Sequence, residues 1–177
     1  LILTLNGRFL ANVNEIHQPY HHIEILRKIN QLIGNVSFDA NQADEDITRI
    51  QSISHEKPLN ILIVEDNQIN QITLTGILNK FGYQPHIASN GFEALDKVKQ
   101  NHYDLIFMDL QMPGKDGFET TIEILHLLPK QQHPKIVAVS ANTQDSDIKR
   151  CFAVGMDDYL PKPIVVEDLQ NMLLLWG

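Results

Sequence analysis

The sequence contains a single cysteine, Cys151, among its 177 residues. One cysteine excludes a disulfide within the chain and fits a reducing compartment, so we expect a cytoplasmic location. No apolar stretch approaches the roughly 18 residues of a membrane-spanning helix, and no secretory signal peptide is visible. The sequence therefore predicts no membrane contact from this segment.

Basic residues are also scarce, with 14 Lys and Arg against 22 Asp and Glu, which gives a formal net charge of −8. They form no run anywhere in the chain. Nucleic acids and anionic membranes bind basic surfaces, so direct contact with nucleic acid is not expected.

An initial methionine is missing, and Leu1 opens inside an apolar run. We interpret the chain as a piece of a longer protein, which leaves open that the parent protein is anchored in the inner membrane. The length predicts one domain, accompanied at most by a fragment of another.

The first 58 residues are weakly patterned. A strand is predicted at 1–5 and an amphipathic helix at 23–33, whose apolar stripe has no full domain to cover it. This leaves a homodimer through the stripe open. Residues 35–58 are mostly polar and are predicted to be a linker, with one helical turn at 46–53.

Beyond residue 58, apolar strands and amphipathic helices alternate. Strands are predicted at 60–64, 85–88, 103–108, 135–140 and 159–160. Helices are predicted at 67–81, 118–128, 144–154 and 166–175. One more helix is predicted to begin after Asn90-Gly91, with Phe92, Leu95 and Val98 pointing inward. Five strands and five helices in strict alternation predict a doubly wound α/β fold, a parallel sheet with helices on both faces.

The most informative stretch ends in Asp109. Residues 103–108 comprise five apolar residues and one charge, a composition typical of a strand buried on both faces of a parallel sheet. Pro113, Gly114 and Gly117 then force a loop. Open α/β sheets bind ligands at the carboxyl ends of their strands, so Asp109 is a candidate site residue, although alone it could simply end the strand.

Two more carboxylates, Glu65 and Asp66, follow the first strand of the alternating series. Since the first and third strands of a doubly wound sheet are neighbours, Glu65, Asp66 and Asp109 are predicted to share one crevice. Crowded carboxylates repel, which raises the pKa of at least one of them. A Mg²⁺ ion would remove that penalty. The alternative role for Glu65 and Asp66 is capping of the following helix.

A hydroxyl and an ammonium group stand at two other strand ends. Ser140 ends the strand at 135–140, and Lys162 follows the strand at 159–160. Both can bind phosphoryl oxygens. Separately, Ser140 could be a helix cap and Lys162 a solvated lysine, but complementary groups at four strand ends favour a phosphoryl-transfer site.

With these residues in place, residues 59–177 resemble the receiver domain of two-component phosphorelays. The resemblance rests on four motifs in the family's order and spacing: Val64-Glu-Asp-Asn-Gln-Ile-Asn-Gln71, Met108-Asp-Leu-Gln-Met-Pro-Gly-Lys-Asp-Gly117, Val139-Ser-Ala-Asn142 and Tyr159-Leu-Pro-Lys-Pro163. It implies a flavodoxin-like sheet with strand order 2-1-3-4-5. The first two motifs resemble receivers fused to hybrid sensor histidine kinases, so the resemblance implies such a kinase as the parent protein.

The resemblance also implies roles for individual residues. Asp109 would be the phosphoacceptor, with Mg²⁺ held by Glu65, Asp66, Asp109 and the backbone carbonyl of Gln111. Ser140 and Lys162 would bind the phosphoryl oxygens, and Ser140 and Tyr159 would form the conformational switch. The implied phosphodonor is a histidine kinase or a histidine phosphotransfer domain, which we expect to dock on residues 67–70.

One position departs from the family pattern. Lys115 stands where receivers usually have an apolar residue, and we expect it to loosen the packing of the loop or alter how a partner binds there.

The resemblance also implies a limit on catalysis. The receiver itself would catalyse only its own phosphorylation and dephosphorylation.

Two rival functions follow from the same residues. An aspartyl-phosphate phosphatase would need a second Asp at position 111, where Gln111 stands. A phosphorylation-independent pseudo-receiver, acting as a protein-interaction module, remains the alternative.

Residues 1–34 are predicted to be the tail of a degenerate receiver-like domain. Gln18-Pro19, followed by Ile25 and Ile29, repeats the spacing of Lys162-Pro163 and the apolar residues after it. Gln18 replaces the lysine, so that domain would lack phosphorylation chemistry. A competing match, beginning at Phe9, is the phosphoacceptor helix of a histidine kinase, with Asn14 in place of the reactive histidine.

Overall fold

The computed structural model describes residues 2–5, 8–12, 53–141 and 144–176. Near the N-terminus, β1 (Ile2–Leu5) and β2 (Arg8–Asn12) pair as an antiparallel hairpin. The strand predicted at 1–5 is present, whereas the second strand was not predicted. It includes Phe9, where the competing match to a kinase helix begins. The rest of that match lies outside the described residues.

Other predictions for this part of the chain fall outside the described residues. They include the helix at 23–33 and most of the linker, of which only the last residues are described. The short helix α3 (Ile53–Glu56) lies within the predicted linker. The assignment of residues 1–34 to a degenerate receiver stays a prediction.

The second part of the chain forms one five-stranded parallel sheet. Its strands lie in the order β4-β3-β5-β6-β7, which in order of sequence is 2-1-3-4-5. The strands are β3 (Ile61–Val64), β4 (His86–Ala88), β5 (Leu105–Asp109), β6 (Lys135–Ser140) and β7 (Asp158–Pro161). The predicted strand order and parallel pairing are confirmed.

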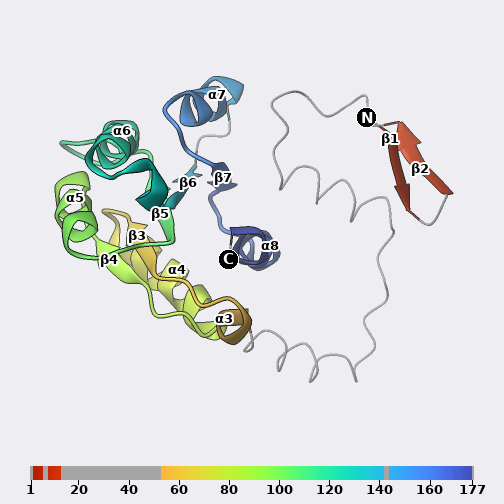
Figure 1. Cartoon of the computed structure of the whole chain (residues 1–177), viewed down its shortest axis with the longest axis horizontal. Coiled ribbons are helices and arrows are strands. Elements are labelled where there is room, and N and C mark those ends of the chain that lie inside the picture. The colour runs from red at the N-terminus through yellow and green to blue at the C-terminus, as the bar shows by residue number, and fades with distance from the viewer. Residues whose placement is uncertain (1, 6–7, 13–52, 142–143, 177) are drawn as a thin grey trace. The chain divides into compact units, whose positions relative to one another are not determined.

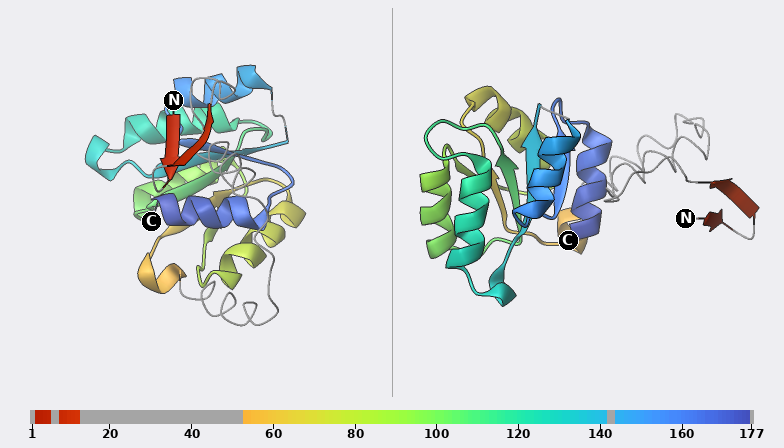
Figure 2. Two further views of the ribbon diagram at one scale, coloured as in Figure 1. Left: turned by 90° about the vertical axis from the view of Figure 1, so that its right-hand side faces the viewer. Right: turned by 90° about the horizontal axis from the view of Figure 1, so that it is seen from above.

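Helices cover both faces of this sheet, as predicted. Figure 1 shows α5, α6 and α7 along one side and α4 and α8 along the other, and Figure 2 shows the same layers from two further sides. The helices are α4 (Gln68–Lys80), α5 (Gly91–Gln100), α6 (Gly117–Leu127), α7 (Asp145–Ala153) and α8 (Val166–Trp176). The 3₁₀ turn η1 (Lys130–Gln132) was not predicted.

The central strand β5 is buried along its whole length, Asp109 included. Alternate residues of the strands point to opposite faces, so Leu62, Ile106 and Ile136 enter one apolar cluster together with Leu95 and Val98 of α5. The other strand residues face the layer of α4 and α8. A strand covered on both sides has no room for a solvated side chain until it ends, which fixes Asp109 at the edge of the core.

Two helices present apolar side chains to solvent. Phe92 was predicted to point inward, but its side chain is 60% exposed, while Ala94, Leu95 and Val98 form the buried face of α5. On α4, Ile69 and Ile72 lie on the face opposite the buried Leu74 and Leu78. Within the described residues, no helix is both long and apolar enough to cross a bilayer.

Candidate functional site

Three carboxylates meet at the carboxyl edge of the sheet. β3 and β5 are hydrogen-bonded neighbours with Val64 opposite Met108, so the residues that follow, Glu65 and Asp109, emerge side by side. One carboxylate oxygen from each of Glu65, Asp66 and Asp109 lies within 4.8 Å of the others. Glu65 and Asp109 are buried, at 5% and 6% exposure, whereas Asp66 is exposed. The predicted crevice is present.

Lys162 joins two of these carboxylates. Its Nζ donates to Glu65 Oε2 and to Asp109 Oδ2, both at 2.7 Å. The backbone N–H of Lys162 donates to the carbonyl oxygen of Ser140 at 2.9 Å, which ties the residue after β7 to the end of β6. One ammonium group therefore draws together the ends of strands that lie far apart in the sequence.

The charges in this cluster shift one another's pKa values. Burial raises the pKa of Asp109, assisted by the charge of Glu65, although Lys162 opposes the shift. Burial would also raise the pKa of Glu65, but the hydrogen bonds from Lys162 and Asn70 outweigh it and lower that pKa. The pKa of Lys162 is raised because its two carboxylate partners outweigh its burial. The pKa of Asp109 is thus raised in the expected direction, but burial and not repulsion between carboxylates is the main cause.

The remaining carboxylate oxygens also accept hydrogen bonds. Asp109 Oδ1 accepts from the backbone N–H of Gln111 at 3.0 Å. Glu65 Oε1 accepts from the side-chain amide of Asn70 at 2.9 Å and from the backbone N–H of Asn67 at 3.2 Å. Gln111 thus lies at the site as predicted, while the role of its carbonyl as a metal ligand stays a prediction.

This cluster fits a divalent cation. Carboxylate oxygens are hard ligands, and two of the three carboxylates are withdrawn from solvent, where their mutual repulsion is least screened. Lys162 offsets part of that charge, yet the pKa of Asp109 stays raised. The exposed Asp66 leaves a side open to solvent, and Mg²⁺ usually keeps several waters.

The helix-capping role considered for Glu65 and Asp66 belongs to their neighbour. Asn67 is the N-cap of α4, and its Oδ1 accepts hydrogen bonds from the backbone N–H groups of Ile69 and Asn70. Glu65 supports this cap indirectly, by accepting from the Asn67 backbone. The carboxylate of Glu65 is therefore directed to the crevice as well as to the helix start.

Ser140 and Tyr159 lie on the two strands next to the cluster. Val139 pairs with Asp109 across β5 and β6, so Ser140 stands one residue further out at the same edge. Ser140 is 2% exposed, and Tyr159 is 9% exposed within the apolar cluster. Their roles in phosphoryl binding and switching stay predictions.

Lys115 does not behave as a loose surface residue. Its side chain is only 13% exposed, its Nζ forms an ion pair with Glu123 on α6, and it lies 5.3 Å from the centre of the Phe92 ring. Its methylene groups pass over Gly91 at the start of α5. Lys115 therefore fastens the loop after Asp109 to two helices, contrary to the expected loosening.

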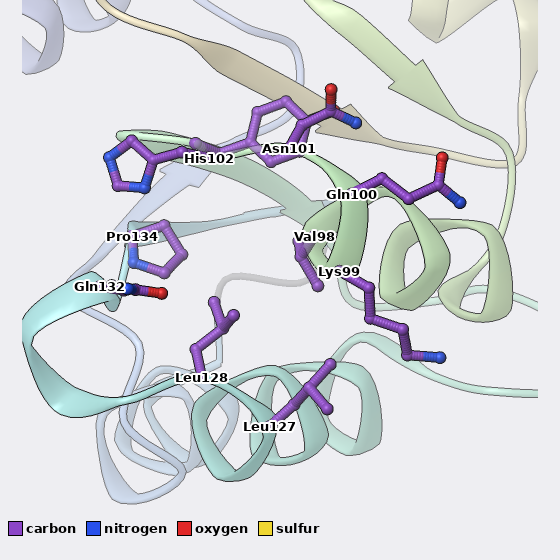
Figure 3. A pocket seen from close by; sticks show the side chains of 10 residues that line it. Val98, Lys99, Gln100, Asn101, His102, Leu127, Leu128, Gln132 and Pro134 are labelled. Atoms are coloured by element: carbon purple, nitrogen blue, oxygen red, sulfur yellow. The ribbon is translucent and has the colours of Figure 1, made fainter.

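A separate pocket of about 430 Å³ lies at the opposite edge of the sheet (Figure 3). It opens where α5 and α6 end, between Val98, Leu127 and Leu128, and it includes Tyr103 and Pro134 at the starts of two strands. No carboxylate lines it. This pocket is therefore separate from the acidic cluster at the other edge of the sheet.

Sequence reasoning missed the contacts of Asn70. It placed residues 67–70 on a docking surface, whereas the Asn70 side chain reaches back to Glu65. The signal was available in the spacing, because an amide five residues after a strand-end carboxylate, in the first turn of the next helix, can face that carboxylate.

Residues 61–174 match the family model of the response regulator receiver domain. Among curated relatives, hybrid signal transduction histidine kinase B of Dictyostelium discoideum is 43% identical over 124 residues, which is 64% of this chain and 6% of the kinase. The signal transduction histidine-protein kinase BarA of Escherichia coli K12 is 35% identical over 116 residues, 66% of this chain and 12% of that protein. The chain thus corresponds to a small part of the relatives it matches.

Solved structures agree with this match. The receiver domain of Ssk1, crystallised with the histidine phosphotransfer protein Ypd1 of Saccharomyces cerevisiae, gives a TM-score of 0.64 at 35% identity, covering 68% of this chain and 90% of the other. The receiver domain of the sensor histidine kinase PA1611 from Pseudomonas aeruginosa, with magnesium in its active-site cleft, gives 0.61 at 33% identity, covering 67% and 96%. Fold, acidic cluster and relatives together show that this chain belongs to the response regulator receiver domain family.

Proposed function

We propose that this domain accepts a phosphoryl group from a phosphohistidine onto Asp109 in a Mg²⁺-dependent reaction and passes the signal on by changing a partner-binding face. The observation that carries the proposal is the contact of Lys162 with both Glu65 and Asp109, which places an ammonium group beside the nucleophile.

The transfer needs positioning more than covalent help from the protein. An Asp109 carboxylate oxygen attacks phosphorus in line, the P–N bond to the donor imidazole breaks, and the imidazole leaves with the electron pair. Lys162 Nζ, and in our proposal the Ser140 hydroxyl, bind the phosphoryl oxygens. Bound Mg²⁺, held by Glu65, Asp66, Asp109 and the Gln111 carbonyl, would neutralise charge on the same oxygens.

Several contacts prepare the nucleophile. The Gln111 N–H holds one Asp109 oxygen at 3.0 Å, so the carboxylate cannot rotate freely at the end of β5. Burial to 6% exposure keeps most water away from it. The raised pKa of Asp109 follows from that burial, and the attack uses the ionised form, which Lys162 stabilises.

The switch in this proposal runs through Ser140 and Tyr159. A phosphoryl group on Asp109 would draw the Ser140 hydroxyl toward it, and Tyr159, on the neighbouring strand, would move further inward. The two residues lie on adjacent paired strands, Tyr159 opposite Ala138 and Ser140 opposite Pro161, which makes such coupling short-range.

The proposed donor is a histidine kinase or a histidine phosphotransfer domain. The related Ssk1 receiver was crystallised with such a protein, Ypd1. On this chain, Ile69 and Ile72 are exposed near the start of α4, the helix that follows Glu65 and Asp66, and we propose them as an apolar docking surface. We further propose that this chain is a cytoplasmic domain of a hybrid histidine kinase, since it matches relatives of that kind.

Intact mass spectrometry tests the proposal. The chain is incubated with acetyl phosphate and MgCl₂, alongside the variant Asp109→Asn and the matched control Asp96→Asn, which changes an exposed Asp of α5. We expect one phosphoryl adduct in wild type and in Asp96→Asn, lost in Asp109→Asn and in EDTA. A wild-type chain without an adduct would contradict the proposal and favour the pseudo-receiver.

A further inference from the structure

The first turn of α4 is organised around Glu65. Asn67 caps the helix, and its backbone N–H donates to Glu65 Oε1. Gln71 Nε2 donates to the Glu65 carbonyl oxygen at 2.6 Å and lies 3.3 Å from Ser89 Oγ. Asn70 alone in this turn donates to the Glu65 carboxylate from a side chain, at 2.9 Å.

The two oxygens of Glu65 therefore have different surroundings. Oε1 faces Asn70 and the helix start, whereas Oε2 faces Lys162 and, beyond it, Asp109. A carboxylate held at one oxygen cannot rotate about its terminal bond without breaking that hydrogen bond. Glu65 is 5% exposed, so water cannot easily replace the lost donor.

We propose that Asn70 is a positioning residue for the metal site: its amide fixes the Glu65 carboxylate so that Oε2 stays directed into the crevice. This inference rests on the proposed Mg²⁺ site and adds a residue to it. Groups that hydrogen-bond to metal ligands commonly set ligand orientation, and their loss weakens metal binding about 10- to 100-fold.

A purely local role in the helix does not account for the contact. Two N–H groups at the start of α4, those of Ile69 and Asn70, already donate to the Asn67 side chain. The Asn70 amide is directed at a buried carboxylate instead of at the helix backbone or at solvent. Replacing Asn70 with alanine removes the donor while retaining a good helix former, so the helix should persist.

Isothermal titration calorimetry of MgCl₂ into the metal-free chain tests this role. The variants are Asn70→Ala and a matched control, Thr73→Ala, on the exposed face of the same helix. We expect about 10-fold weaker Mg²⁺ binding for Asn70→Ala. Thr73→Ala should stay within about two-fold of wild type, as a surface substitution does. Thermal unfolding without metal checks that both variants are folded.

Three outcomes are distinct. Weaker binding in Asn70→Ala alone supports the positioning role. Equal affinities in all three proteins overturn that role but leave the proposed metal site intact. A wild-type chain that binds no Mg²⁺ overturns both, and the mass experiment with Asp109→Asn then shows independently whether phosphorylation fails with it.

Discussion

At the scale of single residues, Lys162 is the group on which the charge balance of the crevice depends. It contacts both buried carboxylates at 2.7 Å, although 97 residues separate it from Glu65. Two carboxylates at 5% and 6% exposure would otherwise face each other with little solvent to screen them. The same ammonium therefore serves the stability of the free protein and the proposed chemistry.

Replacing Lys162 with alanine should lower the free energy of unfolding at pH 7. Removing one partner of a buried ion pair costs about 3–5 kcal/mol, and we expect about 2 kcal/mol here because Lys162 is itself partly solvated. Urea unfolding in EDTA measures the loss. Lys149→Ala, at an exposed position on α7, is the control and should change stability by less than about 0.5 kcal/mol.

The loss in Lys162→Ala should depend on pH with a definite sign. Without the ammonium, burial raises the folded-state pKa of Glu65 above its unfolded value, and the pKa of Asp109, already raised, rises further. The folded state then binds more protons, so the deficit is full at neutral pH and shrinks as the pH falls through the raised folded values. A deficit independent of pH would show that lost packing, not charge, is responsible.

The sequence predicted which residues meet in the crevice but not how they bond. Strand-end logic placed Glu65, Asp66 and Asp109 together because strands of a parallel sheet end at one edge. It assigned Lys162 to phosphoryl oxygens and Asn70 to a docking surface. The contacts that Lys162 and Asn70 make with Glu65 depend on side-chain rotamers and, for Asn70, on the distance of α4 from the sheet. Sequence spacing predicts neither.

At the scale of elements, the loop between β5 and α6 is held very close to the strand that ends in Asp109. A Cβ added to Gly117 would lie 2.2 Å from the carbonyl oxygen of Asp109 and 2.9 Å from Leu110 Cα. Only glycine allows α6 to start this near the strand end. Lys115 fastens the same loop from outside, through Glu123 and Phe92.

Two glycine substitutions should therefore have opposite effects. Gly117→Ala forces the backbone at Asp109 to move and should destabilise the domain by about 2 kcal/mol. Gly76, inside α4, has nothing within 4 Å of an added Cβ, so Gly76→Ala should stabilise by about 0.5–1 kcal/mol through helix propensity. Thermal and urea unfolding compare them. An unchanged Gly117→Ala would contradict the close approach.

The bounds of strands and helices were predicted well where a buried apolar pattern fits only one type of element. Strand 135–140 was placed with its observed bounds, and the helices within one or two residues, because apolar runs and Gly or Asn boundaries are strong local signals. The prediction that Phe92 points inward was wrong because an apolar residue in the first turn of a helix need not face the core. Phe92 contacts Lys115, a partner from a distant loop.

At the scale of the whole domain, the exposed apolar residues are unevenly placed around the acidic edge. Ile69 and Ile72, at 74% and 72% exposure, lie one turn apart near the start of α4, which begins at that edge. Leu127 and Leu175, 45% and 41% exposed, lie near the ends of α6 and α8, at the opposite edge. Of these two pairs, only the first lies near the edge that carries Asp109.

Removing Ile69 and Ile72 should therefore separate docking from chemistry. Phosphoryl transfer from phosphorylated Ypd1 to the double variant Ile69→Ala, Ile72→Ala should be about 10-fold slower than to wild type, the cost of losing a small interface anchor. Modification by acetyl phosphate should be unchanged, because this donor needs no protein surface. The matched double variant Leu127→Ala, Leu175→Ala should retain both rates.

The two donors make the result specific. If both rates fall together in the Ile69 and Ile72 variant, these residues act on the acidic cluster through α4 and Asn70 and not by docking. If neither falls, the donor approaches from another side of the crevice. If Ypd1 fails with wild type while acetyl phosphate succeeds, a histidine phosphotransfer protein of this kind is not the donor, and a histidine kinase becomes the donor to test.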